Sequence, residues 1–84
     1  MKTLTYKTHG TCSQFIDVSV DDNDIIQEIK FVGGCMGNTQ GVARLVKGRK
    51  IDEVISIIKG IDCHGKGTSC PDQLALALEK IKQM

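Results

Sequence analysis

The sequence predicts an α+β domain, with a three-stranded antiparallel meander followed by three helices packed on one face of the sheet. Hydrophobic residues alternate with polar ones up to residue 32, and they recur with helical spacing after the glycine pair at 33–34. Strands that precede the helices, rather than alternating with them, are typical of an antiparallel sheet covered by helices. The chain of 84 residues fits one domain spanning 1–84.

Three segments have the alternating pattern of half-buried strands. They cover residues 3–8, 15–20 and 25–32, and the polar cluster at 21–24 predicts a tight turn between the second and the third. The side chains expected to face the core are Leu4 and Tyr6 in the first strand, Ile16, Val18 and Val20 in the second, and Ile25, Ile29 and Phe31 in the third.

Two short helices are expected next. In the first, Asn38 is a candidate N-cap and Gly48 a stop signal, and the second begins with acidic residues and ends at Gly60. The last helix is predicted over 70–81, with Pro71 in its first turn. The apolar positions at helical spacing are Val42, Leu45 and Val46, then Ile51, Val54, Ile55 and Ile58, then Leu74, Ala77, Leu78 and Ile81.

The composition is that of an ordinary globular protein, with 40% hydrophobic residues, 25% charged residues and a formal net charge of +1. No apolar run approaches the length of a membrane span, and the net charge gives no general reason to expect a nucleic-acid partner. Residues 1–10 lack the apolar region of a secretion signal, so we expect a cytoplasmic protein with reduced cysteines. A local basic cluster is formed by Arg44, Lys47, Arg49 and Lys50.

All four cysteines fall at the ends of predicted elements, although cysteines that only fill a core are expected inside strands or helices. They are Cys12, Cys35, Cys63 and Cys70. Glycines near the first three allow backbone N–H groups to approach a sulfur closely. Cys70 is expected at a helix N-terminus, where unpaired N–H groups favour the thiolate, which is the metal-binding form.

Four converging thiolates would suit tetrahedral zinc or an iron–sulfur cluster, whereas their softness excludes calcium and magnesium. The spacing lacks the paired C-x-x-C motifs of zinc ribbons. A redox or catalytic thiol role, and inert reduced cysteines or disulfides, therefore stay open beside the favoured metal site. His9 and His64 are spare candidate ligands, but we expect each to be a solvated loop histidine.

The string "TSCPD" at residues 68–72, with "GGC" at 33–35 and "GIDC" at 60–63, closely resembles the small stand-alone members of the TSCPD domain family. A related domain is appended to cobalamin-dependent ribonucleotide reductases, and stand-alone members often carry the reductase label. The resemblance implies an accessory role beside a larger enzyme or another protein partner. Enzymatic activity stays open, but this chain is too short to hold a reductase barrel, and we expect no catalysis by it alone.

The chain also has a more distant similarity to U-type iron–sulfur cluster scaffolds, which are α+β domains with a three-stranded antiparallel sheet. Their three cluster cysteines correspond to Cys12, Cys35 and Cys70. The chain departs from them at Gln14, where the scaffolds usually have aspartate, and in its fourth thiol, Cys63. This similarity implies a shared fold and site more than a shared role in cluster transfer.

The sequence thus predicts a small cytoplasmic metal-binding module with zinc or an iron–sulfur cluster on Cys12, Cys35, Cys63 and Cys70. The first alternative is a nucleotide-binding or accessory protein associated with ribonucleotide reductase. It would use the glycine-rich loops and the basic cluster to contact a phosphate or a partner. The second alternative is a thiol redox protein that uses Cys70.

Overall fold

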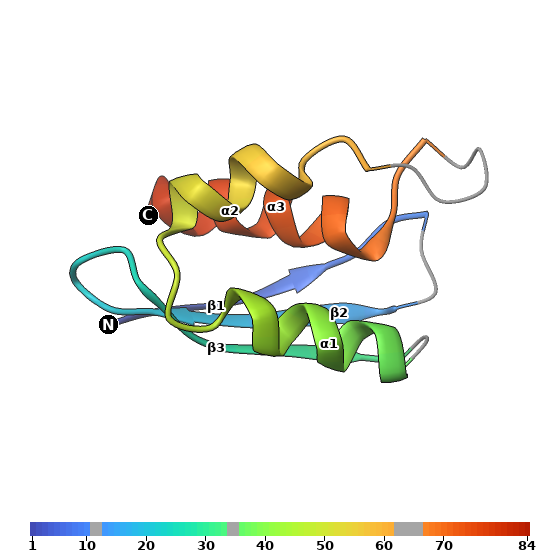
Figure 1. The fold of residues 1–84 in the computed structure, drawn as a ribbon, viewed down its shortest axis with the longest axis horizontal. Coiled ribbons are helices and arrows are strands. Elements are labelled where there is room, and N and C mark those ends of the chain that lie inside the picture. Colours follow the sequence, from blue (N-terminus) through green and yellow to red (C-terminus); the bar gives the residue numbers. More distant parts are fainter. Residues whose placement is uncertain (11–12, 34–35, 62–66) are drawn as a thin grey trace.

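The computed structural model describes residues 1–10, 13–33, 36–61 and 67–84, and of residues 36–39 the backbone alone. The strands come first and the helices after them, so the predicted α+β order is confirmed (Figure 1). The elements are β1 (Lys2–Lys7), β2 (Phe15–Val20), β3 (Ile26–Val32), α1 (Met36–Val46), α2 (Ile51–Ile58) and α3 (Cys70–Lys82).

The sheet is an antiparallel meander in the order β1-β2-β3. Its first two strands pair Leu4 with Val18 and Tyr6 with Ile16, so these four side chains share one face. The inward-facing residues predicted for β2 are fully buried, and those predicted for β1 are partly buried against the same core. The alternating pattern therefore identified the buried face of both strands correctly.

In β3 the prediction was wrong at one position, since Ile26 is fully buried and Ile25 is only partly buried. The register between β2 and β3 shifts beside Ser19 and Val20, and Val20 is paired with Ile26. Such a bulge adds one residue to a strand and reverses the alternation beyond it. Ile25 lies outside the sheet and bridges Lys50 instead.

The helices end close to the predicted glycines, because Gly48 and Gly60 adopt φ angles of +86° and +88°, a region in which glycine is unstrained. Asn38 does not cap α1, which begins at Met36 and so includes Asn38 in its first turn. On α3 the four predicted inward-facing residues, Leu74, Ala77, Leu78 and Ile81, are all fully buried.

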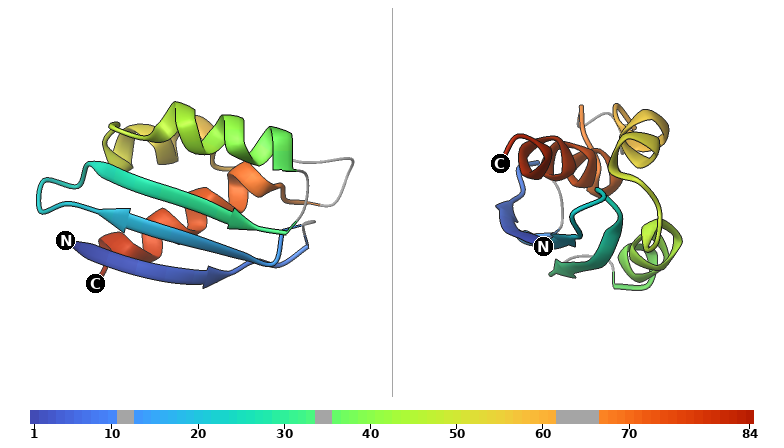
Figure 2. Two further views of the ribbon diagram at one scale, coloured as in Figure 1. Left: turned by 90° about the horizontal axis from the view of Figure 1, so that it is seen from below. Right: turned by 90° about the vertical axis from the view of Figure 1, so that its left-hand side faces the viewer.

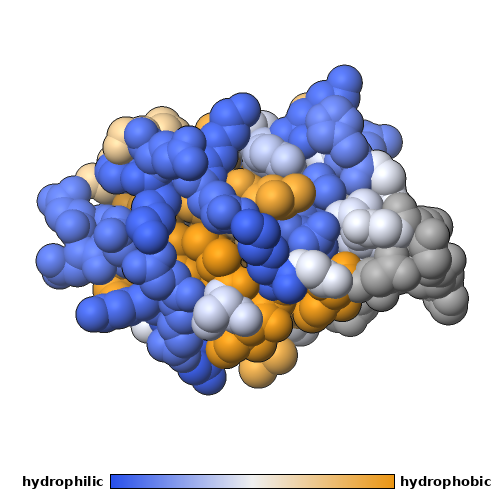
Figure 3. Space-filling view, turned by 90° about the horizontal axis from the view of Figure 1, so that it is seen from above, coloured by the Kyte–Doolittle hydropathy of each residue, from blue (hydrophilic) through white to orange (hydrophobic). Residues whose placement is uncertain are grey.

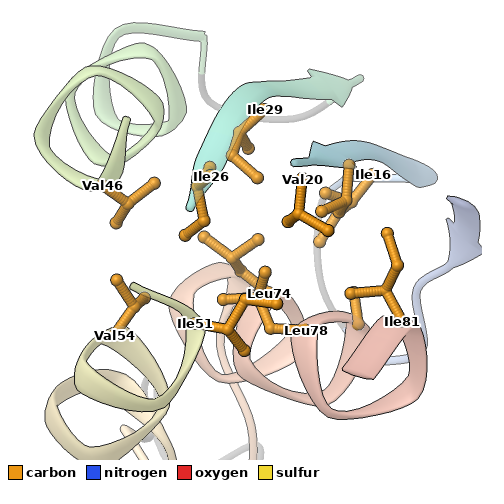
Figure 4. Packing of buried hydrophobic residues seen from close by; sticks show 12 residues of the cluster. Ile16, Val20, Ile26, Ile29, Val46, Ile51, Val54, Leu74, Leu78 and Ile81 are labelled. Carbon is orange, nitrogen blue, oxygen red and sulfur yellow. The ribbon is translucent and has the colours of Figure 1, made fainter. Parts of the chain in front are cut away.

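The helices lie on one face of the sheet, as predicted, but in two tiers (Figure 2). α3 packs on β1 and β2, α1 packs on β3, and α2 packs chiefly on α3. Figure 4 shows the apolar core between the sheet and the three helices. A hydrogen bond from Lys82 to Asp52 ties α3 to α2 at the surface and raises the pKa of the lysine ammonium group.

No helix in the described part of the chain has both the length and the apolar character needed to cross a membrane.

Candidate metal centre

Of the six predicted ligand candidates, the structure describes Cys70 and His9. The positions of Cys12, Cys35, Cys63 and His64 lie outside the described residues. Within those residues, no group of three or more histidine, cysteine, aspartate or glutamate side chains could hold a metal ion. The described part of the site therefore supplies one sulfur, and the geometry around that sulfur can be followed in detail.

Cys70 is the first residue of α3, as predicted, and its thiol is free and partly buried. The helix is capped by Ser69, whose hydroxyl accepts a hydrogen bond from the backbone N–H of Asp72 at 3.1 Å. The Cys70 sulfur lies 3.3 Å from the hydroxyl oxygen of Ser13, which is buried. Ser13 directly follows Cys12, another predicted ligand. The contact therefore places the residue after one predicted ligand against the sulfur of a second, Cys70.

Asp72 has its carboxylate turned away from solvent, and the residue is only 8% exposed. One carboxylate oxygen accepts a hydrogen bond from the backbone N–H of Gly60 at 2.6 Å, and the other accepts one from the Thr68 hydroxyl at 2.6 Å. A buried carboxylate needs such donors to offset its desolvation. Asp72 thereby fastens both sides of the connection between α2 and α3 to the first turn of α3.

Gln73 makes a second buried connection in the same turn. Its side-chain carbonyl accepts a hydrogen bond from the backbone N–H of His9 at 3.1 Å, and its amide donates to the Thr68 hydroxyl at 2.9 Å. The loop after β1 is therefore held to α3 through the backbone of His9. We call Thr68, Asp72 and Gln73 the polar clamp.

The loop after β1 also passes very close to the polar clamp. A side chain at Gly10, which has a φ of +74°, would place its Cβ 3.1 Å from the Thr68 methyl carbon. Thr8 closes the base of this loop, because its hydroxyl donates to the carbonyl of Ser13 and its N–H donates to the carbonyl of Gln14 at 3.1 Å. Both the conformation and the close approach therefore require glycine at position 10.

The end of β3 joins the same region through Gln14. Its N–H donates to the carbonyl of Val32 at 2.7 Å, and a Cβ at Gly33 would lie 3.4 Å from the Gln14 side chain. We define the loop end as residues 8–10, 13–14, 33 and 67–73, which lie at one end of the molecule, on the right in Figure 1. The end of β3 therefore contacts the residue next to Ser13, while the loop after β1 and the connection after α2 contact the first turn of α3.

The sequence reasoning missed the polar clamp and the cap. A signal was present, since a serine followed three residues later by an acidic residue is typical of a helix N-terminus. The burial of Asp72 and Gln73 had no comparable signal, because polar residues in a first helical turn are usually solvated.

Together these features define a small α+β domain whose last helix places a thiol beside the loop after β1 and the connection after α2. The family model for the TSCPD domain matches residues 2–82, so the chain belongs to the TSCPD domain family. No curated protein and no solved structure matches the chain significantly. The similarity to U-type iron–sulfur scaffolds stays a prediction.

Proposed function

We propose that this TSCPD domain is a cytoplasmic metal-binding module in which Cys12, Cys35, Cys63 and Cys70 hold zinc or an iron–sulfur centre. Its role is structural or accessory to a larger enzyme. The observation that carries the proposal is the contact between Ser13 and the Cys70 sulfur, which spans 57 positions of the chain. It supports the close approach of chain segments that a site of distant cysteines requires.

The tethering of the other loops gives further support. Cys12 is next to Ser13, which contacts the Cys70 sulfur, and Cys63 is three residues from Gly60, whose N–H donates to the Asp72 carboxylate. Cys35 is two residues from Gly33, which lies beside Gln14, the neighbour of Ser13. A span of three residues reaches roughly 10 Å when fully extended. These short separations from residues of the loop end support a site that uses all four cysteines.

The donor set fits a soft metal. Cysteine thiolates bind zinc at about 2.3 Å, and four of them make the closed tetrahedral site typical of structural zinc or hold a cluster. A bound zinc would supply folding energy, whereas a cluster would add redox capacity. The Ser13 hydroxyl is suited to donate a hydrogen bond to a ligating Cys70 sulfur, as outer partners of metal ligands commonly do.

The test is to purify the protein without oxygen and to measure its zinc, iron and sulfide content together with its absorption spectrum. We expect stoichiometric metal in the wild type, less in each single Cys→Ser variant, and none in the variant with all four cysteines changed to alanine. A Ser56→Cys variant is the matched control, because it adds an exposed thiol on α2 without adding metal. Stoichiometric metal in the four-alanine variant would show that the assignment is wrong.

A thiol redox role for Cys70 is the second candidate, favoured by its free, partly exposed sulfur at a helix N-terminus. It requires Cys70 to be alkylated much faster than the other three cysteines in metal-free protein. Uniformly slow alkylation of all four would exclude this role and leave the metal proposal standing.

A further inference from the structure

We draw no further inference here: the strongest candidate, the open apolar groove of about 360 Å³ between α1 and α2 (Figure 3), carries none, because nothing in the structure shows what covers it.

Discussion

At the scale of single residues, four residues of the TSCPD string have structural roles, and the fifth, Cys70, supplies the thiol. Ser69 caps α3, Thr68 and Asp72 join the preceding connection to the helix, and Pro71 occupies the first turn, where its missing N–H costs nothing. Cys70 is left with its sulfur beside Ser13. The residues around the cysteine therefore have structural roles that do not depend on a bound metal.

We predict that Asp72→Asn destabilises the domain by about 1–3 kcal/mol, the usual cost of leaving a buried polar group without its partner. The asparagine keeps the shape of the side chain but replaces one acceptor with a donor, which then faces the N–H of Gly60 or the hydroxyl of Thr68. Urea unfolding followed by circular dichroism measures the difference.

Asp22→Asn is the control, because Asp22 is highly exposed and pairs only with the N-terminal ammonium among the described residues. We expect it to change stability by less than about 0.5 kcal/mol. Equal effects of the two substitutions would contradict the structural role assigned to Asp72.

At the scale of elements, the first turn of α3 is the point where separate loops are joined. Gln73 holds the backbone of His9 on one side and Thr68 on the other, while Asp72 holds Gly60. These hydrogen bonds use groups of the protein alone, so we expect the loop end to be organised before any metal binds. Such preorganisation lowers the entropic cost of bringing ligands together.

We predict that Gln73→Met releases the loop after β1 while leaving α3 in place. Methionine has a similar volume but neither accepts from the N–H of His9 nor donates to Thr68, so the His9 amide should lose protection from hydrogen exchange in metal-free protein. If the metal site exists, its affinity should fall roughly 10- to 100-fold, as for other residues that orient metal ligands.

Gln83→Met at the exposed C-terminal cap of α3 is the matched control and should change neither quantity. Unchanged protection of His9 in Gln73→Met would refute the clamp. If the His9 amide loses protection while metal affinity is unchanged, the clamp does not position the metal ligands. The proposed function would then be tested by the cysteine variants alone.

At the scale of the whole molecule, the apolar core and the loop end are distinct regions. The core joins the sheet to all three helices (Figure 4). The loop end is instead built mainly from contacts between buried polar residues. Full burial of each large aliphatic side chain stabilises a fold by about 1.5–3 kcal/mol before the entropy of ordering is subtracted. The core therefore has its own source of stability.

If the site holds a metal, we predict that its removal by a chelator loosens the residues beside the cysteines and leaves the polar clamp and the sheet folded. In hydrogen exchange, amides of Ser13, Gly33 and Gly67 should become less protected, while those of Val18 and Leu78 in the core stay protected. Structural zinc contributes about 10–16 kcal/mol in zinc-finger peptides, which is enough to make their folding depend on the metal. Complete unfolding on chelation would show that the core is insufficient by itself.

Hydrophobic periodicity was sufficient to predict the order of the elements and most of the buried faces, because it indicates which side of a strand or helix faces a core. The sequence predicted the buried residues of β2, four of the buried residues of α3 (Leu74, Ala77, Leu78 and Ile81) and the position of Cys70 at a helix start. These features depend on neighbours close in the chain.

Three other features arise from tertiary contacts. The bulge beside Val20 put Ile26 in the core instead of Ile25, α2 packed on α3, and Ser13 came to rest against the Cys70 sulfur. Each depends on contacts between segments far apart in the chain, and the spacing of residues along one segment carries no information about the partner that it meets. The convergence of these loops was therefore a hypothesis in the sequence, and the structure shows it for the described part of the loop end as specific contacts.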